Sequence, residues 1–296
     1  MLTGARRAVL IAGPTASGKS ALALKMAGEM GGVIINADAM QVYDGLRILT
    51  ARPSDADLSA APHRLYGFVP PATRFSTGDW SRAVTELTRK ERAEPLIFVG
   101  GTGLYFDVLT TGFAEVPEVP EEVTAAAMDE VEGLDREQRA ALLTERDPQM
   151  ASRLNEFDPQ RVVRALAVRA ATGKSLATFQ EQPQKPLLDG WSVVRLVINP
   201  EREDLRERIA ARFETMLEAG AVDEVRALLA QNLDPSLPAM KAIGVREIGD
   251  WQAGTISREE AVERAVTATR QYAKRQRTWL RNRMADWRWV TSPQSA

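Results

Sequence analysis

The sequence has no cysteine and a single histidine, His63, and both shortages narrow the chemistry open to the protein. Without cysteine there is no disulfide, no thiolate metal site and no thiol nucleophile. One imidazole cannot build a multi-histidine metal site or a histidine proton relay. We therefore expect His63 to have a structural role.

Long apolar runs and an excess of charge of one sign are also missing. No apolar stretch approaches the roughly 20 residues that span a bilayer, and the run Ala8–Ala12 is too short for the core of a signal peptide. The 38 basic and 40 acidic residues leave a net charge of −2, so any affinity for nucleic acid must come from local clusters of charge. These absences predict a cytoplasmic protein that does not insert into membranes.

The first hundred residues have the pattern of an α/β fold. The short apolar runs Ala8–Ala12, Val33–Ile35 and Leu96–Val99 are typical of buried strands. Helical spacing lies between them, at Lys19–Met30 and Trp80–Arg92. Strands and helices that alternate at this spacing predict a parallel sheet built from βαβ units.

The pattern changes after residue 114. The segment Glu115–Glu122 holds four glutamates and two prolines, which indicates a hinge, and no convincing strand follows until Val193–Ile198. A helix is expected from Asp158 to Ala171, and further helices are expected at Asp204–Glu218, Ala221–Ala230 and Ser257–Arg281. We therefore predict an α/β core made of residues 1–114 and 188–296, interrupted by a helical insertion domain at 115–187.

A phosphate-binding motif follows the first predicted strand. Residues 13–20 read GPTASGKS, which fits G-x-x-x-x-G-K-[ST] and opens a predicted helix. Glycines let backbone N–H groups wrap around phosphate oxygens, and the helix N-terminus adds partial positive charge. Lys19 supplies a full charge, and the Ser20 hydroxyl can hold Mg²⁺. The predicted diphosphate site comprises Gly13, Pro14, Thr15, Ala16, Ser17, Gly18, Lys19 and Ser20.

The usual equipment for nucleotide hydrolysis is incomplete. A P-loop NTPase carries an acidic Mg²⁺ residue at the end of a neighbouring strand, but Leu96–Val99 is followed by Gly100-Gly101-Thr102-Gly103. The GTPase base-reading motif N-K-x-D is absent as well. This favours a transferase that uses a diphosphate as a handle or leaving group.

An acid, Asp38, lies just past the second predicted strand. The carboxyl ends of parallel strands converge on the ligand, so Asp38 should face the phosphate loop. A carboxylate there can bind Mg²⁺ or remove a proton from a nucleophile. Capping the N-terminus of a following helix explains Asp38 equally well on the residues alone.

A basic segment lies near the C-terminus. The stretch Arg270–Arg283 reads RQYAKRQRTWLRNR, with six basic residues and no acid. Lys274, Arg277 and Arg281 are spaced to share one helix face. Such a face suits a phosphate backbone, and the aromatic residues within it can stack on bases. The alternative is a solvated helix whose aromatic residues lie in the core.

Taken together, these motifs resemble the tRNA dimethylallyltransferase family, also called tRNA isopentenyltransferases, of the bacterial type. The resemblance covers nearly the whole chain. Its marks are Gly13–Ser20, Asn36–Tyr43, Thr50–Pro53, Ala61–Leu65, Val99–Tyr105, Asp158–Leu166, Ala211–Val225, Ala242–Glu247 and Thr269–Arg281.

The resemblance implies a P-loop kinase-like core with a helical insertion. It also implies transfer of a dimethylallyl group from dimethylallyl diphosphate to N6 of adenosine 37, beside the tRNA anticodon. Asp38 would be the general base, Lys19 and Arg212 would face the leaving diphosphate, Ser20 would hold Mg²⁺, and Thr102 would touch the tRNA.

Further tRNA contacts are implied by the same resemblance. They fall on Asp38, Ala39, Met40, Gln41 and Thr102, on Gln160, Arg161, Val162, Val163 and Arg164, and on Lys274, Arg275 and Arg277. The expected partners are therefore the anticodon stem-loop of tRNA and dimethylallyl diphosphate. The protein itself is expected to be a monomer.

Two other functions are compatible with parts of the sequence. A small-molecule kinase of the P-loop class would explain the phosphate loop and Asp38 but not the basic C-terminal segment. An RNA-binding protein without activity would explain that segment but would leave Lys19 and Asp38 without a role.

Overall fold

The computed structural model describes residues 5–91, 94–182 and 185–295. The chain forms two compact units, one of Met1–Thr110 with Leu187–Ala296 and one of Thr111–Pro186. Each unit is described by itself below.

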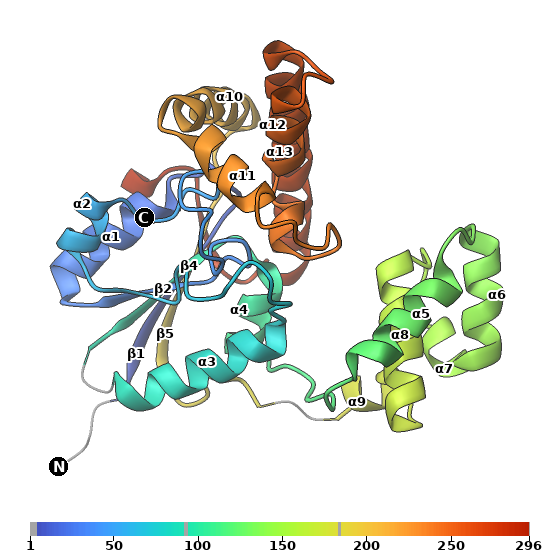
Figure 1. Cartoon of the computed structure of the whole chain (residues 1–296). Helices are drawn as coiled ribbons and strands as arrows, with labels where there is room; N and C mark the ends of the chain where they lie inside the picture. Colours follow the sequence, from blue (N-terminus) through green and yellow to red (C-terminus); the bar gives the residue numbers. More distant parts are fainter. Residues whose placement is uncertain (1–4, 92–93, 183–184, 296) are drawn as a thin grey trace. The chain divides into compact units, whose positions relative to one another are not determined.

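The larger unit is built on a six-stranded, all-parallel sheet (Figure 1). Its order is β3-β2-β4-β1-β5-β6. The strands are β1 (Arg7–Ala12), β2 (Val33–Asn36), β3 (His63–Arg64), β4 (Leu96–Gly100), β5 (Ser192–Ile198) and β6 (Arg288–Val290). The predicted α/β class and four of these strands are confirmed. The edge strands β3 and β6 span two and three residues, too few to show a period in the sequence.

Helices surround this sheet. They are α1 (Lys19–Met30), α2 (Asp55–Ala60), α3 (Thr77–Lys90), α4 (Gly103–Thr110), α10 (Arg202–Glu218), α11 (Ala221–Leu229), α12 (Val245–Gln252) and α13 (Arg258–Arg283), with 3-10 turns η1 (Ala239–Lys241) and η2 (Pro293–Ser295). Helices α2, α4 and α12 were not predicted from the sequence. None of the helices in the described residues is long and apolar enough to cross a membrane.

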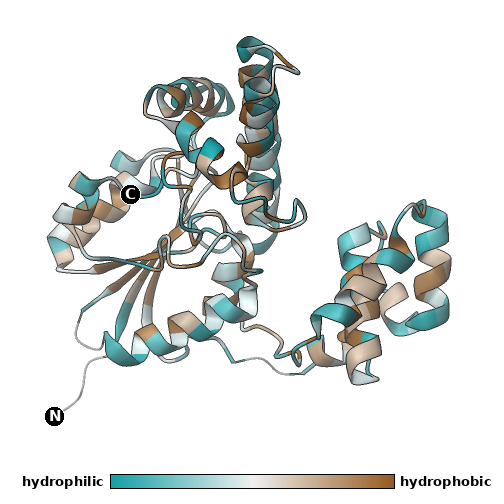
Figure 2. Ribbon diagram, viewed as in Figure 1, coloured by the Kyte–Doolittle hydropathy of each residue, from teal (hydrophilic) through white to brown (hydrophobic). Residues whose placement is uncertain are grey.

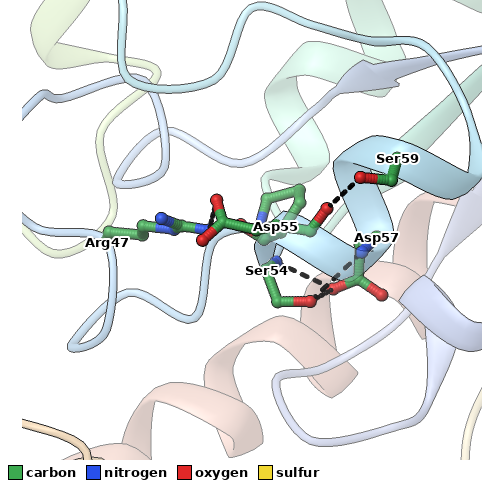
Figure 3. Close-up of polar contacts among 6 residues, drawn as sticks. Arg47, Ser54, Asp55, Asp57 and Ser59 are labelled. Carbon is green, nitrogen blue, oxygen red and sulfur yellow. Dashed lines mark hydrogen bonds and ion pairs between the residues drawn. The ribbon is translucent and has the colours of Figure 1, made fainter.

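Local chemistry sets where helix α2 begins (Figure 3). The Ser54 hydroxyl accepts a hydrogen bond from the Asp57 N–H, and the Asp57 carboxylate accepts one from the Ser54 N–H. This reciprocal pair satisfies two helix-terminal donors. Asp55 in the first turn pairs with Arg47 at 2.6 Å.

The strands consist mostly of hydrophobic residues (Figure 2), and most of these residues are buried. Ile11 and Ile97 belong to a buried cluster with Leu22 of α1. Trp80 of α3 stacks on Tyr105 of α4, with ring centroids 4.2 Å apart. The sheet is thereby buried by apolar contacts with its flanking helices, as a parallel sheet requires.

The smaller unit is helical. It contains α5 (Glu121–Val131), α6 (Arg136–Arg146), α7 (Pro148–Ala151), α8 (Pro159–Thr172) and α9 (Leu176–Gln180). The Asp158 side chain caps α8, and Gly173 ends it in a left-handed conformation, close to the predicted bounds. Val162 and Leu166 of α8 are buried with Leu143 in the core of this unit.

The sheet brings three segments to one edge. Strand β4 lies between β1 and β2, so the residues that follow these strands come together. The approach is close: a Cβ on Gly100 would lie 2.0 Å from the Ala37 carbonyl oxygen, so only glycine fits. The phosphate motif, Asp38 and Thr102 all start from this edge.

Candidate active site

The phosphate loop connects β1 to α1 and presents a group of donors. Gly13 donates its N–H to the Gly100 carbonyl, and Gly18 takes a left-handed conformation at the start of α1. Within the described chain, no hydrogen bond uses the backbone N–H groups of Ala16, Gly18, Lys19 and Ser20. The Ser17 hydroxyl is buried and has no partner among the described residues. Free donors at a helix N-terminus form an anion site.

Lys19 lies in this loop, where its surroundings disfavour the charge of its ammonium group. Its Nζ donates to the Pro14 carbonyl oxygen at 3.2 Å. Burial lowers the pKa of Lys19 to about 8; the negative charge of Asp38 opposes this shift, and the positive charge of Arg212 adds to it. A bound diphosphate would supply the negative charge that this site lacks.

Arg212 reaches the site from α10. Burial lowers the pKa of its guanidinium, and the Asp38 carboxylate raises it again. Lys19, Asp38 and Arg212 therefore interact electrostatically, although they come from three separate segments: the phosphate loop, the end of β2 and the distant helix α10. This arrangement agrees with a place for Arg212 near a diphosphate.

Asp38 is held by its own turn. Its N–H donates to Asn36 Oδ1 at 2.8 Å, and Asn36 Nδ2 donates to the Asp38 carbonyl at 2.9 Å. Asp38 Oδ1 accepts the Met40 N–H at 3.0 Å. Turns follow Asp38, and the next helix begins only at Asp55, so the alternative in which Asp38 caps a helix is wrong. Its carboxylate is fixed at the sheet edge that carries the phosphate loop.

Thr102 stabilises the stretch after Asp38. Its hydroxyl accepts the Ala39 N–H at 2.9 Å, and its own N–H donates to the Ala37 carbonyl at 3.2 Å. Gln41 points its amide nitrogen at the carbonyls of Thr50 and Ala51. Thr102 is half-buried, so its hydroxyl both orients this stretch and lies near the site.

The basic residues of α13 differ in their exposure. Lys274 and Arg275 are exposed. Together with Trp279 they line a pocket of about 680 Å³, whose other lining residues are Gln271, Thr278, Asn282 and Arg283. Arg277 is half-buried; burial lowers the pKa of its guanidinium, and the charges of Arg281 and of Glu201 and Arg202 at the start of α10 also act on it. Lys274, Arg277 and Arg281 are spaced three and four residues apart in one continuous helix, so they lie along one side of α13, as the spacing predicted.

The aromatic residues of α13 were expected either to be available for stacking on bases or to lie in the core, and they do neither completely. Tyr272 and Trp279 are half-buried, so they are neither core residues nor free side chains. Burial raises the pKa of Tyr272, and hydrogen bonds with Thr102 and Gln276 oppose that rise. The Trp279 indole N–H is buried without a partner in the described part of the chain.

One residue of the site was missed by sequence reasoning. Gln276, between the basic residues of α13, is only 5% exposed. Its Oε1 accepts the Thr15 N–H at 2.9 Å, and its Nε2 donates to the Gly101 carbonyl at 3.0 Å. The only signal in the sequence was an uncharged side chain within a basic run.

The insertion offers polar side chains on α8. Gln160, Arg161 and Arg164 are exposed. Val162 is fully buried and Val163 is packed against the same core, so their side chains face inward. The side chains of this segment that could contact RNA are therefore the three polar ones.

No cluster of three or more histidine or acidic residues that could hold a metal occurs in the described residues. The Ser20 side chain is exposed in the first turn of α1. His63 has its Nδ1 2.8 Å from the Ala61 carbonyl oxygen, and its ring meets Tyr66 edge-on. These contacts agree with a structural role for His63.

The fold and the site define a P-loop α/β protein that presents an anion cradle beside a fixed carboxylate. The family model described as IPP transferase matches residues 41–283, and one described as isopentenyl transferase matches residues 6–69. The chain belongs to the IPP transferase family, as the resemblance in the sequence indicated.

Several known proteins resemble the chain over nearly its whole length. It is 53% identical to the tRNA dimethylallyltransferase of Chelativorans sp. (strain BNC1), over 97% of this chain and 98% of that protein. It is 52% identical to the enzyme of the same name from Allorhizobium ampelinum, over 94% of this chain and 92% of the relative.

Solved structures of transferases of this kind are similar to the chain as well. The tRNA isopentenylpyrophosphate transferase of Bacillus halodurans shares 30% identity with a TM-score of 0.67, over 96% of this chain and 89% of that one. A eukaryotic dimethylallyltransferase described as acting on tRNA shares 27% identity with a TM-score of 0.81, over 98% of this chain and 75% of that one.

Proposed function

We propose that this protein is a tRNA dimethylallyltransferase. It transfers a dimethylallyl group from dimethylallyl diphosphate to N6 of adenosine 37 in tRNA, giving N6-(dimethylallyl)adenosine and diphosphate. The observation that carries the proposal is the position of the Asp38 carboxylate. It lies at the sheet edge that carries the phosphate loop, and it interacts electrostatically with Lys19 and Arg212. The family supports the same reaction.

The donor's diphosphate binds in the phosphate loop. The free N–H groups of Ala16, Gly18, Lys19 and Ser20 and the unpaired Ser17 hydroxyl are donors for its oxygens. The Thr15 N–H is already bonded to Gln276, so Thr15 would contribute its hydroxyl. Lys19 and Arg212 offset the charge that develops on the leaving diphosphate, which lowers the barrier to breaking the carbon–oxygen bond.

Mg²⁺ fits this site as a companion of the diphosphate. The Ser20 hydroxyl is the protein ligand we propose. Mg²⁺ binds readily through few protein oxygens together with substrate phosphates and water, which suits a loop without an acidic cage. The ion would neutralise diphosphate charge, in addition to what Lys19 and Arg212 neutralise.

Asp38 acts on the acceptor. The lone pair of an exocyclic adenine amine is delocalised, so the amine attacks well only if a base takes its proton. A bond forms between N6 and the first carbon of the dimethylallyl group, and the carbon–oxygen bond to the diphosphate breaks with its electron pair. The N6 proton passes to the Asp38 carboxylate. A stacked base cannot reach such a site, so adenosine 37 must be extruded from the anticodon loop.

RNA contacts are proposed on both units of the chain. The turn of Asp38, Ala39, Met40 and Gln41, with Thr102, receives the extruded base. Lys274, Arg275 and Arg277 of α13, and Gln160, Arg161 and Arg164 of the insertion, contact the rest of the anticodon stem-loop. Every catalytic residue comes from one chain, so a monomer suffices, and a tRNA substrate implies action in the cytoplasm.

A comparison of two labels tests the reaction. The protein is incubated with an anticodon stem-loop RNA and either labelled dimethylallyl diphosphate or γ-labelled ATP. We expect label in the RNA from the prenyl donor alone. Label that enters RNA only from ATP, or phosphorylation of a metabolite without RNA, would reject prenyl transfer in favour of a kinase.

The role of Asp38 is tested by Asp38→Asn, which keeps the shape of the side chain and removes the base. We expect the turnover number to fall by about 10²–10⁴ while RNA affinity stays within about twofold. The matched control is Asp55→Asn, an exposed aspartate on α2 (Figure 3), which should leave both unchanged. Intact single-turnover chemistry with lost RNA binding would contradict this role.

A further inference from the structure

Gln276 stands apart from the basic residues around it. Its neighbours Lys274 and Arg275 are exposed, whereas Gln276 is 5% exposed on the inner side of α13. A polar side chain buried this deeply is costly unless its donor and acceptor are both used. Its partners therefore indicate its role.

Both ends of the Gln276 amide are used. The carbonyl Oε1 accepts the Thr15 N–H at 2.9 Å, inside the phosphate loop. The nitrogen Nε2 donates to the Gly101 carbonyl at 3.0 Å, in the turn after β4. A Cβ on Gly101 would lie 2.1 Å from this nitrogen, so the glycine makes room for the contact. One side chain thus ties α13 to two loops of the active site.

These two loops carry different halves of the proposed chemistry. Thr15 immediately precedes the residues whose N–H groups are free for an anion. The hydrogen bond from its own N–H to Gln276 therefore fixes the backbone conformation at the start of the anion-binding part of the loop. Gly101 precedes Thr102, which holds the backbone next to Asp38. Gln276 therefore sets the phosphate loop against the turn that carries the base.

We propose that Gln276 is a positioning residue for the prenyl donor rather than an RNA contact. Its amide holds the phosphate loop in the shape that accepts a diphosphate, although it lies within the basic segment that faces RNA. The identity of the donor rests on the proposed function, but the binding of a diphosphate does not.

The chemistry of the position requires both a donor and an acceptor at the end of one side chain. Gln276→Met keeps the length but leaves the Thr15 N–H and the Gly101 carbonyl unpaired. Gln276→Glu keeps an acceptor for Thr15 but sets a carboxylate oxygen against the Gly101 carbonyl. Both variants should loosen the conformation of the phosphate loop that accepts a diphosphate. The methionine variant tests this without adding charge.

Two binding measurements separate the roles. Binding of inorganic pyrophosphate with Mg²⁺ is measured by calorimetry without RNA, and binding of the stem-loop RNA is measured without donor. For Gln276→Met and Gln276→Glu we expect pyrophosphate to bind about tenfold more weakly or worse, as loss of buried hydrogen bonds implies. The KM for dimethylallyl diphosphate should rise by a similar factor, and RNA affinity should stay within about twofold.

Two variants on the same helix are the controls. Gln271→Met, on the exposed side of α13, should leave pyrophosphate binding unchanged. Lys274→Ala should weaken RNA binding and leave pyrophosphate binding unchanged. The opposite effects of Lys274→Ala and Gln276→Met would show two functions on one helix.

Several outcomes would overturn the inference. Weaker RNA binding with normal pyrophosphate binding in both Gln276 variants would make Gln276 an RNA contact. Normal values for both ligands would show that the bridge does not hold the loop. If the methionine variant does not fold, the glutamate variant decides alone. A wild-type protein that binds pyrophosphate but transfers no prenyl group would refute the proposed function and leave this inference standing.

Discussion

Replacing Lys19 should make the protein more stable and inactive at once. Lys19 is half-buried in the phosphate loop, and desolvation of its ammonium lowers its pKa from 10.5 to about 8. At pH 7 the ammonium stays charged in a site that disfavours charge. Lys19→Met fills the same space without the charge, and the Pro14 carbonyl that Lys19 contacts keeps its hydrogen bond from the Ser17 N–H.

The magnitude follows from the two pKa values. Each pKa unit corresponds to about 1.4 kcal/mol, so a fall from 10.5 to about 8 means that a charged Lys19 costs the folded protein about 3 kcal/mol. Below pH 8 both the folded and unfolded states are protonated, and the whole cost is present. Between pH 8 and 10.5 the unfolded state binds more protons, so wild-type stability rises with pH and the cost disappears.

Urea unfolding of the ligand-free proteins measures this effect. We expect the free energy of unfolding of Lys19→Met to exceed that of the wild type by about 1–3 kcal/mol at pH 7, and the gap to close as the pH approaches 10. Added pyrophosphate should stabilise the wild type but not the variant, because only the wild type binds it tightly. A variant that is less stable at pH 7, or a gap that does not change with pH, would refute the reasoning.

Two other predictions concern the RNA surface and the sheet edge. Neutralising Lys274, Arg275 and Arg277 together should weaken RNA binding and reduce the slope of log affinity against log salt by about 2–3, whereas neutralising Lys25, Arg82 and Lys90 on α1 and α3 should not; an unchanged slope in a salt titration would mean that α13 is not an RNA surface. Gly100→Ala should destabilise the fold and lower activity, because its Cβ would lie 2.0 Å from the Ala37 carbonyl oxygen. Thermal unfolding checks this, with Gly28→Ala in open space on α1 as the control; equal melting temperatures for wild type and Gly100→Ala would contradict the close approach.

The elements of secondary structure could largely be predicted from the sequence. The strand before the phosphate loop, helix α1 with bounds Lys19–Met30, and helix α8 with its Asp158 cap and Gly173 stop all agree with the structure. Apolar spacing and end signals act over a few residues, so a single sequence carries them. Short edge strands such as β6 carry too few residues for such a signal.

The sequence by itself determined the chemistry that was available, namely a phosphate loop, an acid after the second strand and a basic C-terminal helix. The tertiary structure decided which of these groups meet. It placed Arg212 close enough to Asp38 for their charges to interact, and it turned Gln276 inward to the phosphate loop. Such contacts join residues far apart in the chain, and packing between elements sets them, whereas the local pattern of side chains along each element does not.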